Sequence, residues 1–332
     1  KYDPIAVSSE STVVAEYIPD AAGAGSYQSE AELERELIRL LAMHPAIELA
    51  FVSSRERDGQ LLNGFENAAP AGMRYENLTP EQALQRNVDV LVLALPNGLA
   101  GEWTRAYDAA HSSAVLVDLS ADYRFEPDWY YGLPELNRQQ YNGQKRISNP
   151  GCYATAMQLA IAPMRGSLSG PVQCFGVSGY SGAGTTPSDK NDPDKLKDNL
   201  MPYALAGHIH EREAADRMAC ELQFMPHVAP HFRGLSVTVN IPLNKPLRLD
   251  EVVANYRDFY DDEPLVGVQT QAPWLSAVAG TPKAIVGGFT LSADGRRLVV
   301  VSVLDNLLKG AASQALQNIN TALHLNETMG IL

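Results

Sequence analysis

Residues 148–155 place a nucleophile at the start of a helix. Cys152 follows two helix breakers, Pro150 and Gly151, and the mostly apolar residues 154–163 predict a buried helix after it. Unpaired backbone N–H groups and the positive end of the helix dipole favour the thiolate of a cysteine in this position. The alternative is a small apolar residue that only fills a helix start. This stretch alone fits both interpretations, and the rest of the sequence favours an activated nucleophile.

A pair of histidines offers the acid–base chemistry that such a cysteine needs. His208 and His210 stand beside Glu211, but no third residue at a suitable spacing completes a metal site. An imidazole can stabilise a thiolate and protonate a developing alkoxide near neutral pH. The alternative is two surface histidines near a helix start. We predict one acid–base histidine and no metal, and we favour His210 because Glu211 and the following helix could not hold both rings inward.

Three further features are candidates for ligand binding. Residues 179–184 carry three glycines after a strand, so backbone N–H groups could approach a flat or anionic ligand, although a surface loop has the same composition. Residues 53–55, Ser-Ser-Arg, end a strand where NAD enzymes carry an acidic residue, and they suit the 2′-phosphate of NADP instead. Arg124 and Arg233 could each clamp an anionic substrate or pair with a surface carboxylate.

Composition narrows the class of protein. A chain of 332 residues with 45% hydrophobic residues is expected to form two domains. Its net charge of −13 argues against a nucleic acid or an anionic membrane as the main partner. The three cysteines form no CxxC pair, which suits a reducing cytoplasm, and no apolar run approaches the ~20 residues that span a bilayer. We therefore expect a cytoplasmic protein with a small-molecule substrate.

The N-terminal half has the pattern of an α/β fold. Nearly all-apolar strands separated by helices predict a doubly wound, Rossmann-like parallel sheet with both faces covered. We expect a helix from Ser29 to His44, and strands at residues 12–18, 47–52, 88–95 and 114–119. Polar or turn-forming residues follow three of these strands, at 53–55, 96–98 and 120–124, where such sheets bind ligands.

The second half predicts a different domain. Its strands alternate apolar and polar residues with few helices between them, which indicates an α+β domain with a mixed or antiparallel sheet. One helix is expected near residues 250–260, and a helix rich in small residues follows Asn306. The strands are expected at residues 172–178, 221–226, 235–241, 284–291 and 297–304.

Several motifs in order resemble the N-acetyl-gamma-glutamyl-phosphate reductase family, within the aspartate-semialdehyde-dehydrogenase-like group. They are Asn-Pro-Gly-Cys-Tyr at 149–153, Ser-Gly-Ala-Gly at 181–184 and Asp-Asn-Leu-Leu-Lys-Gly at 305–310, and the resemblance covers about residues 37–332. It implies that Cys152 attacks the acyl phosphate of N-acetylglutamyl 5-phosphate and forms a thioester, which NADPH reduces to the semialdehyde in arginine biosynthesis. A histidine of the pair would be the acid–base.

The resemblance also implies a layout for the site. The dinucleotide-binding domain would span 1–151, the catalytic and dimerisation domain 152–305, and the helix 306–332 would return to the first domain of a homodimer or homotetramer. The residues expected to bind NADP(H) are Ser53, Ser54, Arg55, Pro96, Ser181, Gly182, Ala183 and Asn306, and those expected to bind substrate are Arg124, Arg233 and Asn149.

The N-terminus departs from the family pattern. Gln28, Ala31 and Glu34 stand where relatives carry a Gly-x-x-Gly-x-x-Gly turn, and glutamates at 30, 32 and 34 would bring negative charge toward a bound pyrophosphate. Residues 1–38 resemble instead the N-terminal segment of type I restriction motor subunits. Two other functions stay open: a cysteine hydrolase, and a catalytically impaired relative that acts as a small-molecule-binding or assembly subunit.

Overall fold

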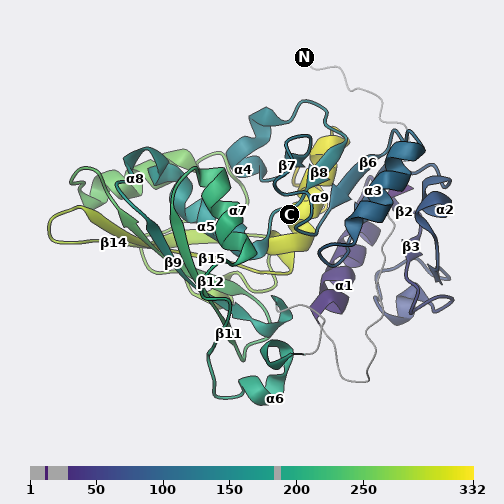
Figure 1. The fold of residues 1–332 in the computed structure, drawn as a ribbon, viewed down its shortest axis with the longest axis horizontal. Coiled ribbons are helices and arrows are strands. Elements are labelled where there is room, and N and C mark those ends of the chain that lie inside the picture. The colour runs from purple at the N-terminus through teal and green to yellow at the C-terminus, as the bar shows by residue number, and fades with distance from the viewer. Residues whose placement is uncertain (1–11, 14–28, 183–187) are drawn as a thin grey trace.

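The computed structural model describes residues 12–13, 29–182 and 188–332, which build two large sheets that lie beside each other (Figure 1) and one small two-stranded sheet. The first sheet has six parallel strands in the order β2-β1-β5-β6-β8-β7. Its strands are β1 (Thr12–Val13), β2 (Glu48–Leu49), β5 (Val90–Leu93), β6 (Val115–Asp118), β7 (Tyr130–Tyr131) and β8 (Arg146–Ser148). The predicted parallel sheet is thus confirmed.

Helices cover both faces of this sheet, as its apolar strands require. In β5, Val90 and Val92 belong to a core shared with α1 (Ser29–Ala42) and α9 (Ser313–Ala322). Leu91 and Leu93 belong to a second core shared with α3 (Ala100–Ala109), beside α2 (Pro80–Leu84). The period-two alternation therefore sends successive side chains into two separate cores.

The prediction of one continuous strand at residues 47–52 is wrong, because the strand in the large sheet, β2, ends at Leu49. The chain leaves the large sheet after Leu49, and β3 (Val52–Ser53) pairs with β4 (Tyr75–Glu76) in a separate two-stranded sheet. The reason is that Leu49 and Phe51 are buried in different cores, so the backbone between them turns away from the sheet. Of the strand expected at 12–18, only Thr12–Val13 lies within the described residues.

The second sheet is mixed, as expected. Its seven strands run in the order β10-β11-β9-β12-β15-β14-β13, with β11–β9 and β14–β13 parallel and the other pairs antiparallel. They are β9 (Val172–Gly179), β10 (Met201–Pro202), β11 (Leu222–Ala229), β12 (Leu235–Pro242), β13 (Val266–Val268), β14 (Ala284–Leu291) and β15 (Arg297–Leu304). All five strands expected in this half are confirmed.

The helix that begins at Cys152 forms the core of this second unit. α5 (Cys152–Ile161) packs on β12 and β15 and against α7 (Ile209–Met218). The hydroxyls of Tyr256 and Tyr260, on and just after α8 (Leu249–Phe259), donate to carbonyls of α5, 2.5 and 2.6 Å away. Short helices complete the fold: α4 (Pro134–Asn137), α6 (Pro193–Leu196) and the 3-10 turns Leu62–Gly64, Arg138–Gln140, Ala162–Ser167, Tyr180–Gly182, Asp189–Asn191 and Leu275–Ala277.

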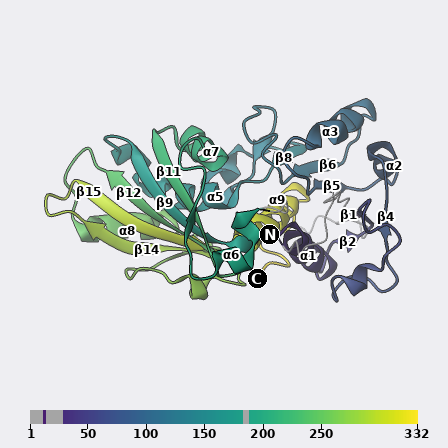
Figure 2. The same ribbon diagram turned by 60° about the horizontal axis from the view of Figure 1, so that its bottom comes forward.

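After β15 the chain crosses back to the first sheet. A π-helical turn, Leu308–Ala312, leads into α9, whose Leu316 and Ile319 lie in the core that also contains Leu37 of α1. Figure 2 shows α9 between the two sheets, beside α1. Among the described residues, no helix has the length and apolar character needed to cross a membrane.

Candidate active site

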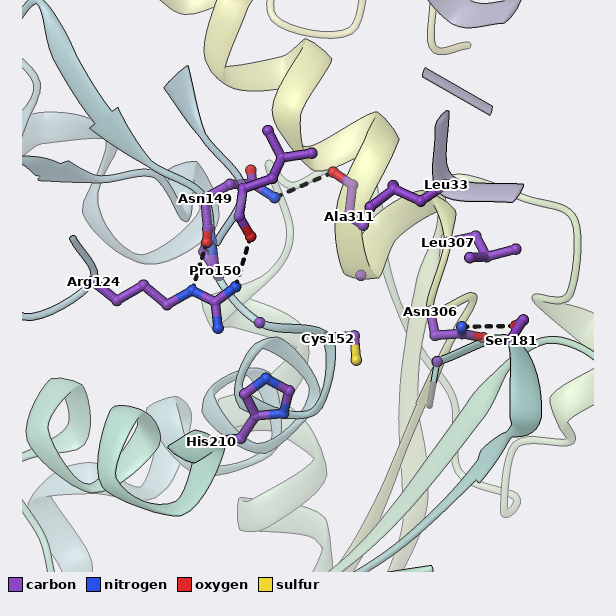
Figure 3. Close-up of a pocket in the computed structure, with 14 residues that line it drawn as sticks. Leu33, Arg124, Asn149, Pro150, Cys152, Ser181, His210, Asn306, Leu307 and Ala311 are labelled. Atoms are coloured by element: carbon purple, nitrogen blue, oxygen red, sulfur yellow. Dashed lines mark hydrogen bonds between the residues drawn. The ribbon is translucent and has the colours of Figure 1, made fainter. Parts of the chain in front are cut away.

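A cavity of about 180 Å³ opens beside Cys152, where the two sheets meet (Figure 3). Its described lining comes from α1, from the loop after β6, from the starts of α5 and α7, and from the turns after β9 and β15. Seven of the predicted site residues line it: Arg124, Asn149, Cys152, Ser181, Gly182, His210 and Asn306. Residues that are far apart in the sequence thus converge on one thiol.

Cys152 is the first residue of α5, as predicted, but its thiol is not a ready thiolate. Gly151 is the N-cap, with an extended backbone, and its carbonyl accepts from the N–H of Thr155 at 2.8 Å. Burial raises the pKa of the Cys152 thiol to about 11, although the Tyr153 N–H and the Arg124 guanidinium act in the opposite direction. The prediction of a low pKa is therefore wrong, because desolvation raises the pKa by more than the groups at the helix start lower it.

The two histidines differ in position. His210 lines the cavity, whereas His208 is the N-cap of α7 and its Nδ1 accepts from the backbone N–H of His210 at 3.1 Å. Burial, reinforced by Arg124 and His208, holds the pKa of His210 well below its usual value of 6.5. Its Nδ1 is buried and has no hydrogen-bond partner. A neutral imidazole that lines the thiol's cavity can accept a proton, although the same burial weakens its basicity.

Glu213 organises the backbone behind the nucleophile, and the sequence analysis did not identify it. Its carboxylate, fully buried, accepts from the Gly151 N–H at 2.9 Å, from Arg124 Nη1 at 2.9 Å and from the Tyr131 hydroxyl at 2.7 Å. The signal that could have found it is spacing, since Glu213 lies three residues after His210 and shares its face of α7. The carboxylate offsets the charge of Arg124 and fixes the loop that carries Cys152.

Asn306 holds together the turn on the other side of the thiol. Its Oδ1 accepts from the Gly234 N–H at 2.6 Å, and its Nδ2 donates to Ser181 Oγ at 2.9 Å. A Cβ at Gly182 would lie 3.1 Å from Ser178 Oγ and 3.2 Å from Asn306 Nδ2, so a side chain there would crowd this turn. Ala183, also expected to bind the cofactor, lies outside the described residues.

The predicted substrate residues have different surroundings. Arg124 and Asn149 line the cavity, and Arg124 Nε donates to the Asn149 carbonyl at 2.9 Å. Arg233 does not line it. Its guanidinium is held by Asp305, at 2.6 and 3.1 Å, and by Glu36 of α1, at 2.7 Å. The structure therefore places Arg233 in a tie between α1 and the turn after β15.

Four of the residues expected to hold the nucleotide, Ser53, Ser54, Arg55 and Pro96, lie at or just after the carboxyl ends of β3 and β5. Ser53 and Ser54 are buried, and their hydroxyls accept from the N–H groups of Leu78 and Arg57. Arg55 is exposed and Pro96 is half-buried. None of these four residues lines the cavity beside Cys152. A ligand that contacts both these residues and the cavity must therefore extend along the edge of the sheet.

The fold and the cysteine-centred cavity define a semialdehyde-dehydrogenase type of protein. Residues 34–144 match the family model "Semialdehyde dehydrogenase, NAD binding domain", and residues 152–306 match "Semialdehyde dehydrogenase, dimerisation domain". Aspartate semialdehyde dehydrogenase II from Vibrio cholerae superposes with a TM-score of 0.73 over 96% of this chain and 99% of its own, at 16% identity. The enzyme from Francisella tularensis gives 0.71 over 93% and 99%, at 18% identity.

Sequence similarity identifies the family. The N-acetyl-gamma-glutamyl-phosphate reductase of Stenotrophomonas maltophilia is 58% identical over 296 residues, which cover 89% of this chain and 93% of its own. That of Xylella fastidiosa is 55% identical over 89% of both chains. The chain belongs to the N-acetyl-gamma-glutamyl-phosphate reductase family. The second resemblance, of residues 1–38 to restriction motor subunits, stays a prediction.

Proposed function

We propose that this chain catalyses the NADPH-dependent reductive dephosphorylation of N-acetyl-L-glutamyl 5-phosphate to N-acetyl-L-glutamate 5-semialdehyde, a step of arginine biosynthesis. The observation that carries the proposal is the single cavity in which Cys152, His210 and Arg124 converge. A relative with the reductase name aligns over 89% of the chain, and the residues proposed as nucleophile and acid–base, Cys152 and His210, line the same cavity. These findings do not favour a catalytically impaired subunit.

The first half-reaction needs a proton acceptor for the thiol. Since burial raises the pKa of Cys152 and lowers that of His210, the thiol holds its proton and the imidazole is neutral until substrate arrives. As sulfur attacks the acyl carbon, the imidazole takes the thiol proton. The C–O bond to phosphate then breaks, a thioester forms, and the imidazolium gives its proton to the departing phosphate.

The second half-reaction returns the thiol. When bound, NADPH supplies the hydride that reduces the thioester carbonyl. The C–S bond then breaks, the aldehyde is released and the sulfur leaves as a thiolate. His210 relays one proton from solvent to that thiolate, so each turnover consumes one proton and releases one phosphate.

The residues present fit a nicotinamide dinucleotide. Leu119 and Leu307 give the cavity apolar walls, and Gly182 leaves room beside the Asn306 carboxamide that a Cβ would fill. We assign the nicotinamide end to this part of the cavity. The adenosine end would lie at the carboxyl ends of β3 and β5, where exposed Arg55 suits the 2′-phosphate of NADP.

Arg124 and Asn149 are the groups proposed to hold the substrate. Three of the five N–H groups of the Arg124 guanidinium donate to Asn149, Leu119 and Glu213, which leaves two for an anion. The Asn149 amide donates one proton to the Ala311 carbonyl and keeps a second. Because both residues line the cavity beside Cys152, they can orient the acyl phosphate for attack.

The proposal extends to assembly and location. We propose a cytoplasmic homodimer or homotetramer in which residues 1–151 bind the dinucleotide, residues 152–305 carry the substrate and subunit contacts, and the terminal helix serves the first unit. The match of residues 152–306 to a dimerisation-domain model supports it. Light scattering after gel filtration measures the mass, and a monomer would contradict this part.

The test is the reverse reaction. The chain is mixed with N-acetylglutamate semialdehyde, NADP and inorganic phosphate, and formation of NADPH is followed by absorbance. We expect turnover that requires phosphate, no turnover by Cys152→Ser, and normal turnover by Cys220→Ser, a half-buried cysteine outside the cavity. No NADPH formation here, together with hydrolysis of acyl phosphate added in a separate forward assay without NADPH oxidation, would indicate a cysteine hydrolase and refute the proposal.

A further inference from the structure

Lys309 is a fully buried cation close to the nucleophile, and the reaction proposed above does not use it. Its side chain is 0% exposed, and Nζ donates to three oxygens: Glu135 Oε1 at 2.6 Å, Gln314 Oε1 at 2.5 Å and Gln317 Oε1 at 2.8 Å. All three ammonium protons are therefore engaged. An ammonium without such partners would be strongly unfavourable in this position.

Lys309 lies inside the π-helical turn Leu308–Ala312, which follows Asn306. The Gly310 N–H donates to the Asp305 carbonyl at 2.9 Å, and the Ala312 N–H donates to the Leu307 carbonyl at 2.8 Å. Both hydrogen bonds join residue i to residue i−5, whereas those of an α-helix join residue i to residue i−4. Such π-helical turns are found frequently at functional sites. The ammonium joins this turn to Glu135 of α4 and to α9.

The π-helical turn touches the nucleophile. A Cβ on Gly310 would lie 2.6 Å from the Cβ of Cys152, so the backbone of the turn packs directly on the cysteine. The Ala311 carbonyl accepts from Asn149 Nδ2 at 3.3 Å, and Asn149 Oδ1 accepts from Asn318 of α9 at 3.1 Å. A shift of the turn would therefore move both the thiol and the Asn149 amide.

The same network reaches the strand edge beside the Cys152 loop. Gln314 Nε2 and Asn318 Nδ2 both donate to the Gly132 carbonyl, each at 2.9 Å. The Gly132 N–H in turn donates to the carbonyl of Ser148, the last residue of β8 and the fourth before Cys152. The polar residues of α9 thus hold two sides of the cavity at once.

Resting on the proposed function, we propose that Lys309 and Glu135 are positioning residues for the reaction. The ammonium fixes the π-helical turn, and the turn fixes Cys152 and Asn149. Stability alone does not require charges here, since a buried ion pair can often be replaced by apolar residues of similar volume without loss. The location of the pair, one residue from the glycine that touches the nucleophile, indicates the positioning role.

The experiment compares Lys309→Met, Glu135→Gln and the double variant with Lys283→Met, which removes an exposed lysine. In both single variants kcat should fall on the order of 10- to 100-fold, with the KM for NADP changed less than about threefold, because misplacement of a reacting group by about 1 Å has this effect. The rate of Cys152 alkylation by iodoacetamide should change in the same variants, and Lys283→Met should match the parent.

The double variant separates positioning from charge compensation. Because it leaves no unpaired buried charge, its melting temperature should recover toward that of the parent. Its kcat should stay low, since the turn has still lost its anchor. Recovery of kcat with stability, or single variants that melt earlier but keep parental kcat and alkylation rates, would overturn the proposal. The alkylation readout needs no turnover, so a failure of the proposed reduction would be seen separately, in the parent chain.

Discussion

Gly151→Ala tests the arrangement of nucleophile, histidine and arginine with one methyl group. The added Cβ would lie 2.5 Å from His210 Cδ2 and 2.6 Å from Arg124 Nη1, against an ordinary contact of 3.4 Å or more. The backbone of Gly151 is extended with φ at −73°, which alanine adopts without strain. The substitution therefore acts through contact with the ring and the guanidinium, each of which must retreat by about 1 Å.

The magnitude follows from this displacement. Overpacking of this kind costs about 1–3 kcal/mol of folding free energy, so the protein should still fold. A 1 Å error in the placement of a catalytic group costs about 100-fold in rate, or about 2.7 kcal/mol of transition-state stabilisation. We expect kcat for the reverse reaction to fall on the order of 100-fold.

The matched control is Gly166→Ala. Gly166 has no heavy atom within 4 Å of the position of an added Cβ and lies outside the cavity, so kcat and melting temperature should stay at parental values. Both variants are assayed for NADPH formation and for thermal unfolding. A Gly151→Ala variant with parental kcat would refute the role given to His210 and Arg124 beside Cys152.

Three further predictions follow from the same geometry. His210→Ala should lower kcat on the order of 100-fold or more because it removes the proton acceptor, whereas His208→Ala should mainly lower thermal stability by about 1 kcal/mol through loss of the α7 cap; equal effects on kcat would contradict the assignment. Arg55→Asp should shift the ratio of kcat/KM from NADPH toward NADH, and an unchanged ratio would rule out a contact with the 2′-phosphate. Burial raises the pKa of Glu34 from 4.5 to about 7, so between these pH values the folded state keeps a proton that the unfolded state has released. The free energy of unfolding should therefore fall by about 3 kcal/mol as the pH rises from 4.5 to 7. Urea titrations of Glu34→Gln should not show this fall.

Local patterns predicted most of the second unit because its strands carry their own signal. The strands predicted at residues 284–291 and 297–304 have the same bounds as β14 and β15, although a bulge between Gly287 and Thr290 interrupts the alternation in β14. The start of α5 followed from Pro150, Gly151 and the apolar run after Cys152. In these segments propensity, burial and neighbouring breakers all favour the same structure, so local reasoning was sufficient.

Contacts between distant segments could not be predicted in this way. Spacing could place Glu213 on the same helix face as His210, but only the fold buries Glu213 beside Gly151 and Lys309 beside Gly310. The pKa of Cys152 could not be predicted for the same reason. The position at the helix start does lower the pKa, but the larger effect is desolvation, which raises it. Desolvation depends on every element that packs around the thiol.

Two glutamates of α1 have partners within the first unit. Glu32 pairs with Arg35 at 2.7 Å, and buried Glu34 accepts from the Tyr75 hydroxyl at 2.5 Å and lies 3.3 Å from Arg57. Glu32 thus has its charge paired within the first unit, and burial favours the protonated, neutral form of Glu34, so both bring little negative charge toward a phosphate.

This pairing also limits what glycine can do at position 34. A glycine would satisfy the backbone requirement of a pyrophosphate turn, but it would remove the carboxylate partner of Arg57 and Tyr75 in a buried site. Arg57 keeps its contacts with the Tyr75 hydroxyl and the Phe65 ring, and it lies three residues after Ser54, at the strand end where the 2′-phosphate is expected. Glu34→Gly should therefore destabilise the first unit while leaving the Arg57 charge on the nucleotide side without its carboxylate partner. Stability and NADPH affinity should change in opposite directions.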